Sequence, residues 1–311
     1  MRKLCTDLVR NCQFGDSMLR RVMKYIRDKE LLEKGDKVLV CVSGGADSIA
    51  LCDVLQRGGF ECVIAHCNFH LRGEESDRDE AFVRRLGYEA MKQEVRVKHF
   101  ETEAYARENG LSIEMAAREL RYEWFAEVAE TEGCKAIAVA HHQNDQAETV
   151  LLNLKRGTGI RGLCGMRAKS DNPYGGKVPV IRPLLCTTRD YIEHYLRDIR
   201  HIDWVNDSTN SDTKIKRNAV REQLKEYSKS EIEHIAATAE HMQGYVDWLE
   251  GQDTAEAGKA KLYEELREYG FAEIDKMYDA LQRGVGGKEF RSATHKAEIR
   301  KGELVIEAIK Q

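Results

Sequence analysis

Hydrophobic runs alternate with amphipathic stretches along the first half of the chain. Lys37 to Val42 is short, β-branched and almost wholly apolar, which predicts a buried parallel strand. Apolar residues at helical spacing follow as far as Gly58 and Gly59, and a second strand is predicted from Glu61 to Phe69. These segments predict one strand–helix–strand unit.

The same alternation continues after the second strand. A helix start is predicted within Glu74 to Asp79, followed by a strand from Glu94 to Lys98, a helix from Ser112 to Glu130 and a strand from Lys135 to Ala140. We therefore predict an α/β fold with a doubly wound, Rossmann-like parallel sheet. Such a sheet is covered by helices on both faces and binds ligands at the carboxyl ends of its strands.

The pattern changes after residue 156. Residues 157–176 are rich in glycine and lack a period, so a long loop is predicted there. An extended segment, 177–185, and a helix from Thr188 follow. Residues 229–282 are predicted to be helical, and residues 290–309 to form a hairpin that turns at Lys301-Gly302.

Three parts of the chain follow from these elements. Residues 1–36 are predicted to be an N-terminal helical segment that docks on the core. Residues 37–225 are predicted to form the domain with the sheet, and residues 226–311 a smaller, mainly helical domain that ends in the hairpin.

Charge is distributed unevenly along a chain whose net charge is −4. Residues 152–200 contain ten Lys or Arg and four Asp or Glu, a local charge of +6, whereas residues 229–283 contain six against thirteen, a local charge of −7. One surface is therefore expected to be basic and able to bind a phosphate backbone, with an ordinary solvated face as the alternative.

The sequence contains neither a membrane-spanning run nor the apolar core of a secretion signal, so we expect a cytoplasmic protein that contacts no membrane. Its nine cysteines are odd in number and never spaced as CxxC, which indicates reduced thiols. Cys62 and Cys67 should point to opposite faces of one strand, which makes a shared metal ion difficult.

Ser43 to Ser48 lies between the first strand and its helix, where free backbone N–H groups and the helix dipole favour a bound anion. Gly44 and Gly45 allow close approach of phosphate, and the hydroxyls of Ser43 and Ser48 can donate to its oxygens. Asp47 would repel phosphate unless a divalent cation lay between them, so we assign it to Mg²⁺. The alternative is a carboxylate placed in the first helical turn by the helix dipole.

Two common nucleotide-binding motifs do not account for the glycine-rich segments of this sequence. The loop lacks the lysine of GxxxxGK[ST], which disfavours γ-phosphoryl transfer and leaves nucleotidyl transfer. Gly157 to Gly162 spells GxGxxG, but the match follows a predicted helix rather than a strand, so we do not interpret it as a dinucleotide site.

A second polar cluster, His141 to Thr149, spans a strand end and a helix start. Asp145 and Glu148 are three residues apart and therefore share one helical face. The pair could hold an ammonium group, bind a metal ion or act as a general base, and residue type alone does not decide. A capping box of Asn144 and Glu148 is the alternative, and the lack of HExxH disfavours zinc.

The loop Ser43 to Ser48 resembles the PP-loop of the N-type ATP pyrophosphatases, and several motifs together resemble the tRNA(Ile)-lysidine synthetase family. The resemblance covers roughly Asp36 to Arg221. In chain order the motifs are Ser43–Ser48, Asn68–Asp77, Ala117–Tyr122, His141–Thr149, Gly157–Met166, Arg182–Leu185, and Asp207–Asn210 with Arg217–Asn218.

The resemblance implies a two-step reaction. ATP adenylates the C2 oxygen of the wobble cytidine in an isoleucine tRNA with a CAU anticodon, and the amine of free lysine then displaces AMP to leave lysidine. The implied cofactors are ATP and Mg²⁺.

It also implies roles for particular residues. Asp145 and Glu148 would receive the lysine, and Arg217 would stabilise the reacting phosphate. The residues implied in ATP binding are Ser43, Gly44, Gly45, Ala46, Asp47 and Ser48 around the pyrophosphate, with Mg²⁺ on Asp47, Ala65 and His66 near adenine, and Arg118 or Arg121 at the α-phosphate.

The implied RNA contacts are the basic loop from Gly157 to Met166, with Arg156, Arg161 and Arg167, and the domain of residues 226–311. Many family members continue into a further C-terminal domain for the acceptor arm, whereas this sequence stops at Gln311, so it is either a short member or a truncated one. We also hypothesise a homodimer.

Three other functions fit parts of the pattern. A PP-loop tRNA thiolase would attack the activated base with sulfur and usually needs paired or clustered cysteines. A small-metabolite synthetase would have no use for the basic loop. A non-catalytic RNA- or nucleotide-binding protein would not need Asp47, Asp145 and Glu148.

Overall fold

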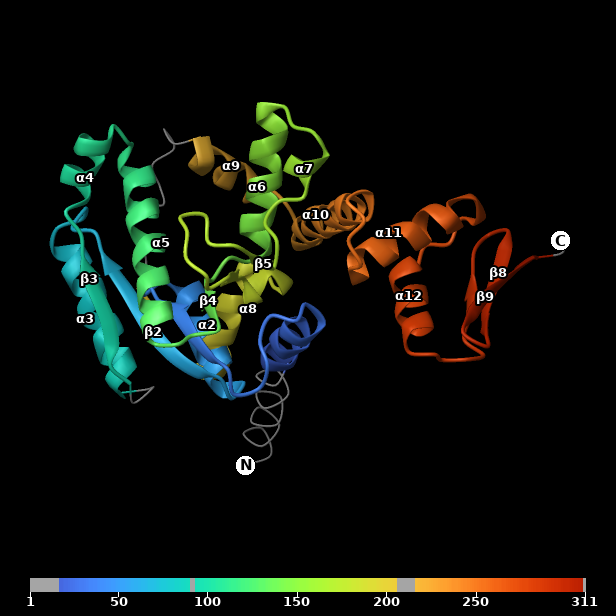
Figure 1. Cartoon of the computed structure of the whole chain (residues 1–311), viewed down its shortest axis with the longest axis horizontal. Coiled ribbons are helices and arrows are strands. Elements are labelled where there is room, and N and C mark those ends of the chain that lie inside the picture. The colour runs from blue at the N-terminus through green and yellow to red at the C-terminus, as the bar shows by residue number, and fades with distance from the viewer. Residues whose placement is uncertain (1–16, 90–92, 206–215, 310–311) are drawn as a thin grey trace. The chain divides into compact units, whose positions relative to one another are not determined.

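A computed structural model describes residues 17–89, 93–205 and 216–309, without the side chains of residues 216–218 (Figure 1). The chain divides into two compact units. The first contains the residues up to Glu148 and those from Arg167 to Glu233, and the second contains Thr149 to Met166 and the residues from His234 onward. The domain boundaries predicted at residues 36 and 225 remain predictions.

The first unit is built on one six-stranded sheet, in the order β3-β2-β1-β4-β6-β5. All neighbouring strands are parallel except β5 and β6. The strands are β1 (Lys37–Cys41), β2 (Glu61–Asn68), β3 (Val95–His99), β4 (Ala136–Ala138), β5 (Lys169–Ser170) and β6 (Val180–Ile181). The predicted α/β fold with a largely parallel sheet is confirmed.

The strand order reverses at β1, which pairs with β2 on one side and β4 on the other. Val40 of β1, for example, is in register with Ile64 and Ala138. Because ligands bind where the order of parallel strands reverses, the segments that follow β1 and β4 are brought to the place where this fold forms sites.

Helices cover both faces of the sheet because its central strands are apolar on both sides. Val38 and Val40 belong to one buried core and Leu39 to the other. The helices of this unit are α2 (Ala46–Arg57), α3 (Glu74–Glu89), α4 (Thr102–Asn109), α5 (Ile113–Thr131), the start of α6 (Gln143–Arg156), α8 (Arg189–His194), η2 (Tyr195–Arg200) and α9 (Lys216–Leu224).

The helix of residues 17–28, together with α2 and α8, packs on the side of Val38, whereas α5 covers the side of Leu39 (Figure 1). Met18, Val22 and Ile26 of the N-terminal helix are buried in the first core. In the described residues 17–89, 93–205 and 216–309, no helix is both long and apolar enough to cross a bilayer.

The segment predicted to be irregular or extended contains short regular elements. Helix α7 (Ile160–Leu163) and strand β5 lie within the predicted loop of residues 157–176. Of the predicted extended segment 177–185, only β6 is a strand, and a 3₁₀ turn follows at η1 (Pro183–Cys186). Pro183 has no N–H to donate to a neighbouring strand and presets a helical φ, so it ends the extended segment.

The second unit has its own core between helices and a small antiparallel sheet. Leu262 and Leu266 of α11, Met277 of α12 and Ile299 of β8 are buried together. Its elements include part of α6, α7, most of α10 (Lys229–Leu249), α11 (Ala255–Leu266), η4 (Arg267–Tyr269), α12 (Ile274–Gln282), β7 (Glu289–Arg291), β8 (His295–Arg300) and β9 (Glu303–Ala308).

The predicted C-terminal hairpin is confirmed for β8 and β9, which turn at Lys301 and Gly302 with φ values of 52° and 84°. Two central residues with positive φ suit the right-handed twist of the flanking strands. Phe290, predicted as the first residue of the hairpin, lies instead in the additional strand β7, which pairs with β8.

Candidate active site

The phosphate loop connects β1 to α2 at the point where the strand order reverses. Gly45 is the N-cap of α2, and no side chain caps the helix, so its first N–H groups face the loop. Gly44 has a φ of +98°, and a Cβ there would lie 3.5 Å from Cγ2 of Val83. Because 3.5 Å is an ordinary van der Waals distance, the loop requires glycine at position 44 for its backbone conformation and not for lack of space.

The serine hydroxyls serve different parts of this loop. Ser48 Oγ donates to the carbonyl oxygen of Gly45 at 2.8 Å and accepts from the N–H of Ser43 at 3.2 Å, so it holds the loop closed. Ser43 lines the adjoining cavity, whereas Ser48 and Ala46 are buried beneath the loop. We infer that Ser43 is the hydroxyl better placed for a phosphate oxygen.

An open cavity of about 790 Å³ adjoins the loop and lies wholly within the first unit. Its volume is within the range of small-molecule sites, roughly 300–1,000 Å³. The residues that line it are Ser43, Gly45, Asp47, His142, Asn144, Asp145, Glu148, Arg189, Asp190, Val205, Arg221, Glu222, Leu224, Lys225, Tyr227 and Ile232. The structure thus brings the phosphate loop and both carboxylates of the second polar cluster to one cavity.

One carboxylate oxygen of Asp47 is paired with an arginine, and the other has no hydrogen-bond partner among the described residues. Its Oδ2 accepts a hydrogen bond from Nη1 of Arg189. Its Oδ1 is buried without a hydrogen-bond partner among the described residues, and Nε2 of His142 lies 3.5 Å away as an ion-pair neighbour. A buried, unsatisfied carboxylate oxygen beside a phosphate loop fits a metal ligand.

No group of three or more His, Cys, Asp or Glu among the described residues could hold a metal ion by itself. A Mg²⁺ ion at Asp47 would therefore need phosphate oxygens and water as its other ligands. Mg²⁺ is commonly bound in that way, through one or two carboxylates and substrate phosphates. The residues present fit such an ion.

His142 connects Asp47 to the second acidic residue of the cavity. Its Nε2 lies 3.5 Å from Oδ1 of Asp47 and 3.4 Å from Oδ2 of Asp145. Burial alone lowers the pKa of His142, but the two carboxylates outweigh this effect and raise the pKa above its ordinary value. The charged imidazolium is therefore favoured between the two acids.

Asp145 also caps its own helix, since its Oδ2 accepts from the backbone N–H of His142 at 3.0 Å. The alternative capping box of Asn144 and Glu148 is wrong. Oδ1 of Asn144 accepts instead from the N–H of Arg189 at 2.9 Å, because the start of α8 lies against the start of α6. Glu148 is only 2% exposed, and its Oε2 accepts from Nε of Arg221 at 2.6 Å.

Outside the phosphate loop, four predicted site residues with described side chains do not line this cavity, namely Ala65, His66, Arg118 and Arg121. Ala65 and His66 are buried, and Nδ1 of His66 donates to the carbonyl oxygen of Val42 at 2.8 Å. Desolvation lowers the pKa of His66, which keeps the ring neutral and its Nδ1 protonated for that bond. Their part in adenine binding remains a prediction.

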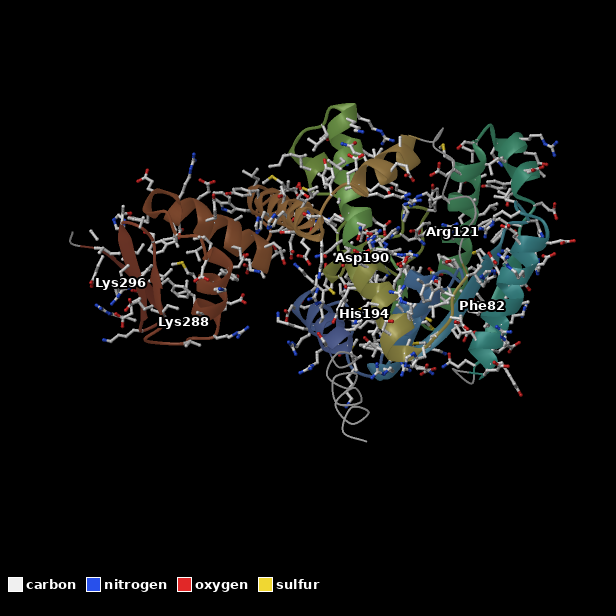
Figure 2. All side chains as sticks on the ribbon, turned by 180° about the vertical axis from the view of Figure 1, so that it is seen from behind. Phe82, Arg121, Asp190, His194, Lys288 and Lys296 are labelled. Atoms are coloured by element: carbon white, nitrogen blue, oxygen red, sulfur yellow. The ribbon has the colours of Figure 1, made fainter. Side chains whose placement is uncertain are left out.

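The guanidinium groups of Arg118 and Arg121 each stack on an aromatic ring at 5.0 Å, that of Tyr122 and that of Phe69 respectively. Figure 2 shows Arg121 on α5 and Asp190 on α8. An α-phosphate contact by either arginine remains a prediction. Arg217 belongs to α9, but its side chain lies outside the described part of the chain.

The sequence reasoning missed two cavity arginines. Arg189 follows the Arg182–Leu185 motif by only a few residues, and Arg221 is the last residue of the region of resemblance. Each could have been suspected from its nearness to a motif, yet neither pairing with a carboxylate can be read from local sequence.

The described cysteines lie outside the cavity of the candidate active site. Cys62 packs in the first core and Cys67 against the second, which confirms that they face opposite sides of β2. Burial raises the pKa of each of these thiols to about 12. None of the seven cysteines in the described part of the chain is in a disulfide, and none lines the cavity.

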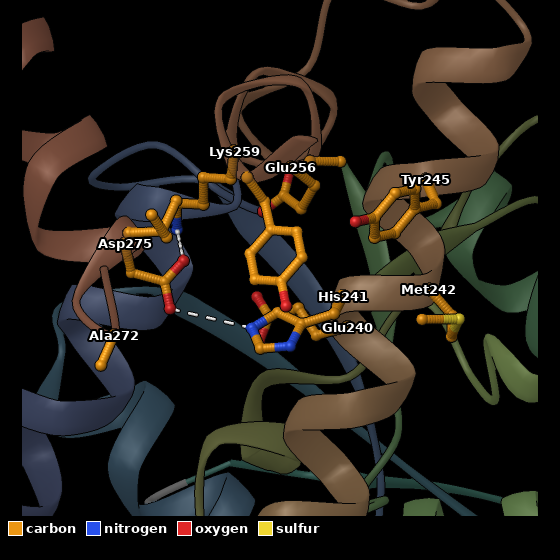
Figure 3. A pocket seen from close by; sticks show the side chains of 11 residues that line it. Glu240, His241, Met242, Tyr245, Glu256, Lys259, Ala272 and Asp275 are labelled. Carbon is orange, nitrogen blue, oxygen red and sulfur yellow. Dashed lines mark ion pairs between the residues drawn. The ribbon is translucent and has the colours of Figure 1, made fainter. Parts of the chain in front are cut away.

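The second unit contains an ion pair of the basic loop and a smaller cavity. Arg161 of the basic loop forms an ion pair of 2.6 Å with Glu250. A separate cavity of about 340 Å³ lies between α10, α11 and the start of α12. There Oδ2 of Asp275 lies 3.8 Å from Nε2 of His241, and Oδ1 lies 3.9 Å from Nζ of Lys259 (Figure 3).

Comparison with known proteins agrees with this arrangement. Residues 16–228 match the PP-loop domain family, and residues 250–309 match the TilS substrate binding domain. The fold and its loop therefore define a PP-loop protein. A solved U34-tRNA thiolase from Methanococcus maripaludis with its 4Fe-4S cluster has a TM-score of 0.58 at 18% identity, covering 74% of this chain and 79% of that one. This likeness supports the fold alone.

Closer relatives are curated as tRNA(Ile)-lysidine synthases. One from Porphyromonas gingivalis is 50% identical over 233 residues, which are 73% of this chain and 50% of the relative. One from Bacteroides thetaiotaomicron is 41% identical over 318 residues, covering 94% of this chain and 72% of the relative. The chain belongs to the tRNA(Ile)-lysidine synthase family, which confirms the resemblance, and it spans half the length of the first of these relatives.

Proposed function

We propose that the chain uses ATP to join lysine to C2 of the wobble cytidine in an isoleucine tRNA with a CAU anticodon. One observation carries this proposal. The same cavity holds a phosphate-binding loop at Ser43 to Asp47 and two carboxylates, Asp145 and Glu148, that suit a substrate with two ammonium groups.

In the first step, the C2 oxygen of cytidine attacks the α-phosphorus of ATP. A new oxygen–phosphorus bond forms, the bond to the β-phosphate breaks, and pyrophosphate leaves toward the N-terminus of α2. The backbone N–H groups at the start of α2 and the hydroxyl of Ser43 would bind its oxygens. Mg²⁺ on Asp47 would supply positive charge against the pyrophosphate. Arg118 or Arg121, and Arg217, are proposed for the α-phosphate.

In the second step, an amine of lysine attacks C2. The new C–N bond replaces the C–O bond, and AMP leaves with the oxygen. Asp145 and Glu148 would hold the ammonium groups, and one of these carboxylates can accept the proton that the attacking amine must lose. The low exposure of Glu148 strengthens its attraction for a cation because little water competes for it.

The tRNA is proposed to contact the basic loop of residues 157–166 and the domain of residues 226–311. The match of residues 250–309 to a substrate binding domain supports the second contact. Contacts of basic side chains with RNA phosphates should make the affinity fall steeply with salt.

A sulfur nucleophile is disfavoured in comparison with lysine. No cysteine lines the cavity within the described part of the chain, and burial raises the pKa of Cys67 to about 12, which keeps its thiol protonated and unreactive.

The test is incorporation of labelled lysine into an isoleucine tRNA transcript with a CAU anticodon, with and without ATP. A transcript with uridine at the wobble position is the matched control. We expect incorporation only with ATP and only into the cytidine transcript. Release of pyrophosphate without incorporation of lysine would retain the adenylation step and reject lysine as the nucleophile.

A further inference from the structure

Arg189 forms an ion pair with a carboxylate of the phosphate loop. Its Nη1 donates to Oδ2 of Asp47, and its Nε donates to Oε1 of Glu193 at 2.7 Å. Both Asp47 and Arg189 line the cavity of the candidate active site. The guanidinium thus occupies the space between α8 and the phosphate loop.

Hydrogen bonds of the backbone hold the main chain of Arg189 in place. The N–H of Arg189 donates to Oδ1 of Asn144 at 2.9 Å, and the N–H of Gln143 donates to the carbonyl oxygen of Thr187 at 2.9 Å. These two bonds join the start of α8 to the start of α6. The side chain beyond this anchor is 35% exposed, so solvent reaches part of it.

The charges in the cavity change when a triphosphate enters. Without ligand, Asp47 needs cations because its side chain is only 22% exposed, and Arg189 supplies that charge at Oδ2 while Nε2 of His142 lies 3.5 Å from Oδ1. A triphosphate adds several negative charges beside the same carboxylate. Asp47 then needs a metal ion between itself and the phosphates, and the guanidinium fork of Arg189 matches phosphate oxygens in two bonds.

We propose that Arg189 exchanges partners. It neutralises Asp47 while the cavity is empty and binds the pyrophosphate part of ATP when Asp47 turns to Mg²⁺. This role rests on the proposed use of ATP but not on lysine or tRNA. It differs from a permanent structural ion pair, in which Arg189 would stay on Asp47 in both states.

Direct binding of inorganic pyrophosphate to the full chain, measured by titration calorimetry without metal ion, separates these two roles. Asp47→Asn should bind pyrophosphate about tenfold more tightly than the wild type, because Arg189 is released, and Arg189→Gln should bind about tenfold more weakly. The double variant should gain much less over Arg189→Gln than Asp47→Asn gains over the wild type. Mere relief of repulsion by Asp47 would strengthen binding equally in both backgrounds, so non-additivity identifies the exchange.

Two further variants serve as controls. Arg197→Gln removes a 61% exposed arginine of η2 outside the cavity and should leave the affinity unchanged. Arg189→Lys keeps the charge and should retain part of the affinity if Arg189→Gln is poorly folded. An unchanged affinity in Asp47→Asn, or a double variant that keeps the full gain, would overturn the proposal. Failure of lysine incorporation would overturn the proposed function but would not affect the conclusion drawn from pyrophosphate binding by the Asp47 and Arg189 variants.

Discussion

Nε of Arg221 donates a 2.6 Å hydrogen bond to Oε2 of Glu148, a carboxylate that is 2% exposed. A buried carboxylate is costly without a cation, and α9 provides one. The place proposed for a substrate ammonium group therefore already has a resident cation. Lysine must displace Arg221 or share Glu148 with it.

Removal of this cation has a testable consequence. Arg221→Ala should lower the free energy of unfolding by about 2–3 kcal/mol, at the low end of a broken buried pair because Arg221 is 38% exposed. Lysine at millimolar concentration should then raise the melting temperature of Arg221→Ala more than that of the wild type, since it replaces the lost charge. Equal shifts in both proteins would contradict the assignment of Glu148 to lysine.

The two half-reactions should separate by residue. Asp47→Ala should abolish tRNA-dependent exchange of pyrophosphate into ATP, because the proposed ligand of Mg²⁺ is lost. Glu148→Gln should retain most of this exchange but slow lysine transfer by about 100-fold or more. Glu127→Gln, on the exposed side of α5, is the control and should affect neither. Equal loss of both half-reactions in Glu148→Gln would undo this division of roles.

The phosphate loop depends on the backbone of Gly44. Gly44→Ala should cost about 1 kcal/mol or more of stability, because φ is +98° there, and should also weaken pyrophosphate binding. Gly59→Ala is a matched control, since Gly59 has a φ of +87° and a Cβ added there would meet nothing within 4 Å. Calorimetric titration should show normal pyrophosphate binding in Gly59→Ala despite a similar loss of stability.

The stability of the second unit should depend on the protonation of His241. The ion pair with Asp275, opposed by desolvation, raises the pKa of His241 above its usual value of about 6.5. Because the folded pKa is raised, the stabilisation is fully present below about pH 6.5 and is lost as the pH rises through the folded pKa. It should be small, since both side chains are more than half exposed.

An NMR titration of His241 checks this directly. The wild type should titrate above about 6.5, and Asp275→Asn should return the midpoint toward that value. A midpoint in Asp275→Asn equal to that of the wild type would show that Asp275 does not set the pKa.

Much of the fold could be predicted because its signals are local. The strand β1 is an apolar run, and α5 begins after Ser112, whose Oγ accepts from the N–H of Met115 as an N-cap. The helix α4 was not predicted, because it buries only Thr102 and Ala106 and so leaves little periodic signal. Tertiary packing rather than pattern stabilises such short helices.

In the candidate active site, too, local motifs could be predicted from the sequence and long-range contacts could not. The phosphate loop and the acidic pair were found because each is a contiguous motif. The partners of those acids were not, since Arg189 is 142 residues from Asp47 and Arg221 is 73 residues from Glu148. Only the folded chain brings these charges together, since β1 and β4 are neighbours in the sheet and the start of α8 is hydrogen-bonded to the start of α6.

The most direct test of the central claim is a product balance on the isoleucine tRNA. Nucleosides from the reacted tRNA are analysed by mass spectrometry while AMP and pyrophosphate are counted. We expect a wobble cytidine heavier by one lysine less one water, with one AMP and one pyrophosphate formed for each. A balanced release of AMP and pyrophosphate with an unmodified cytidine, or with sulfur at that position, would contradict it.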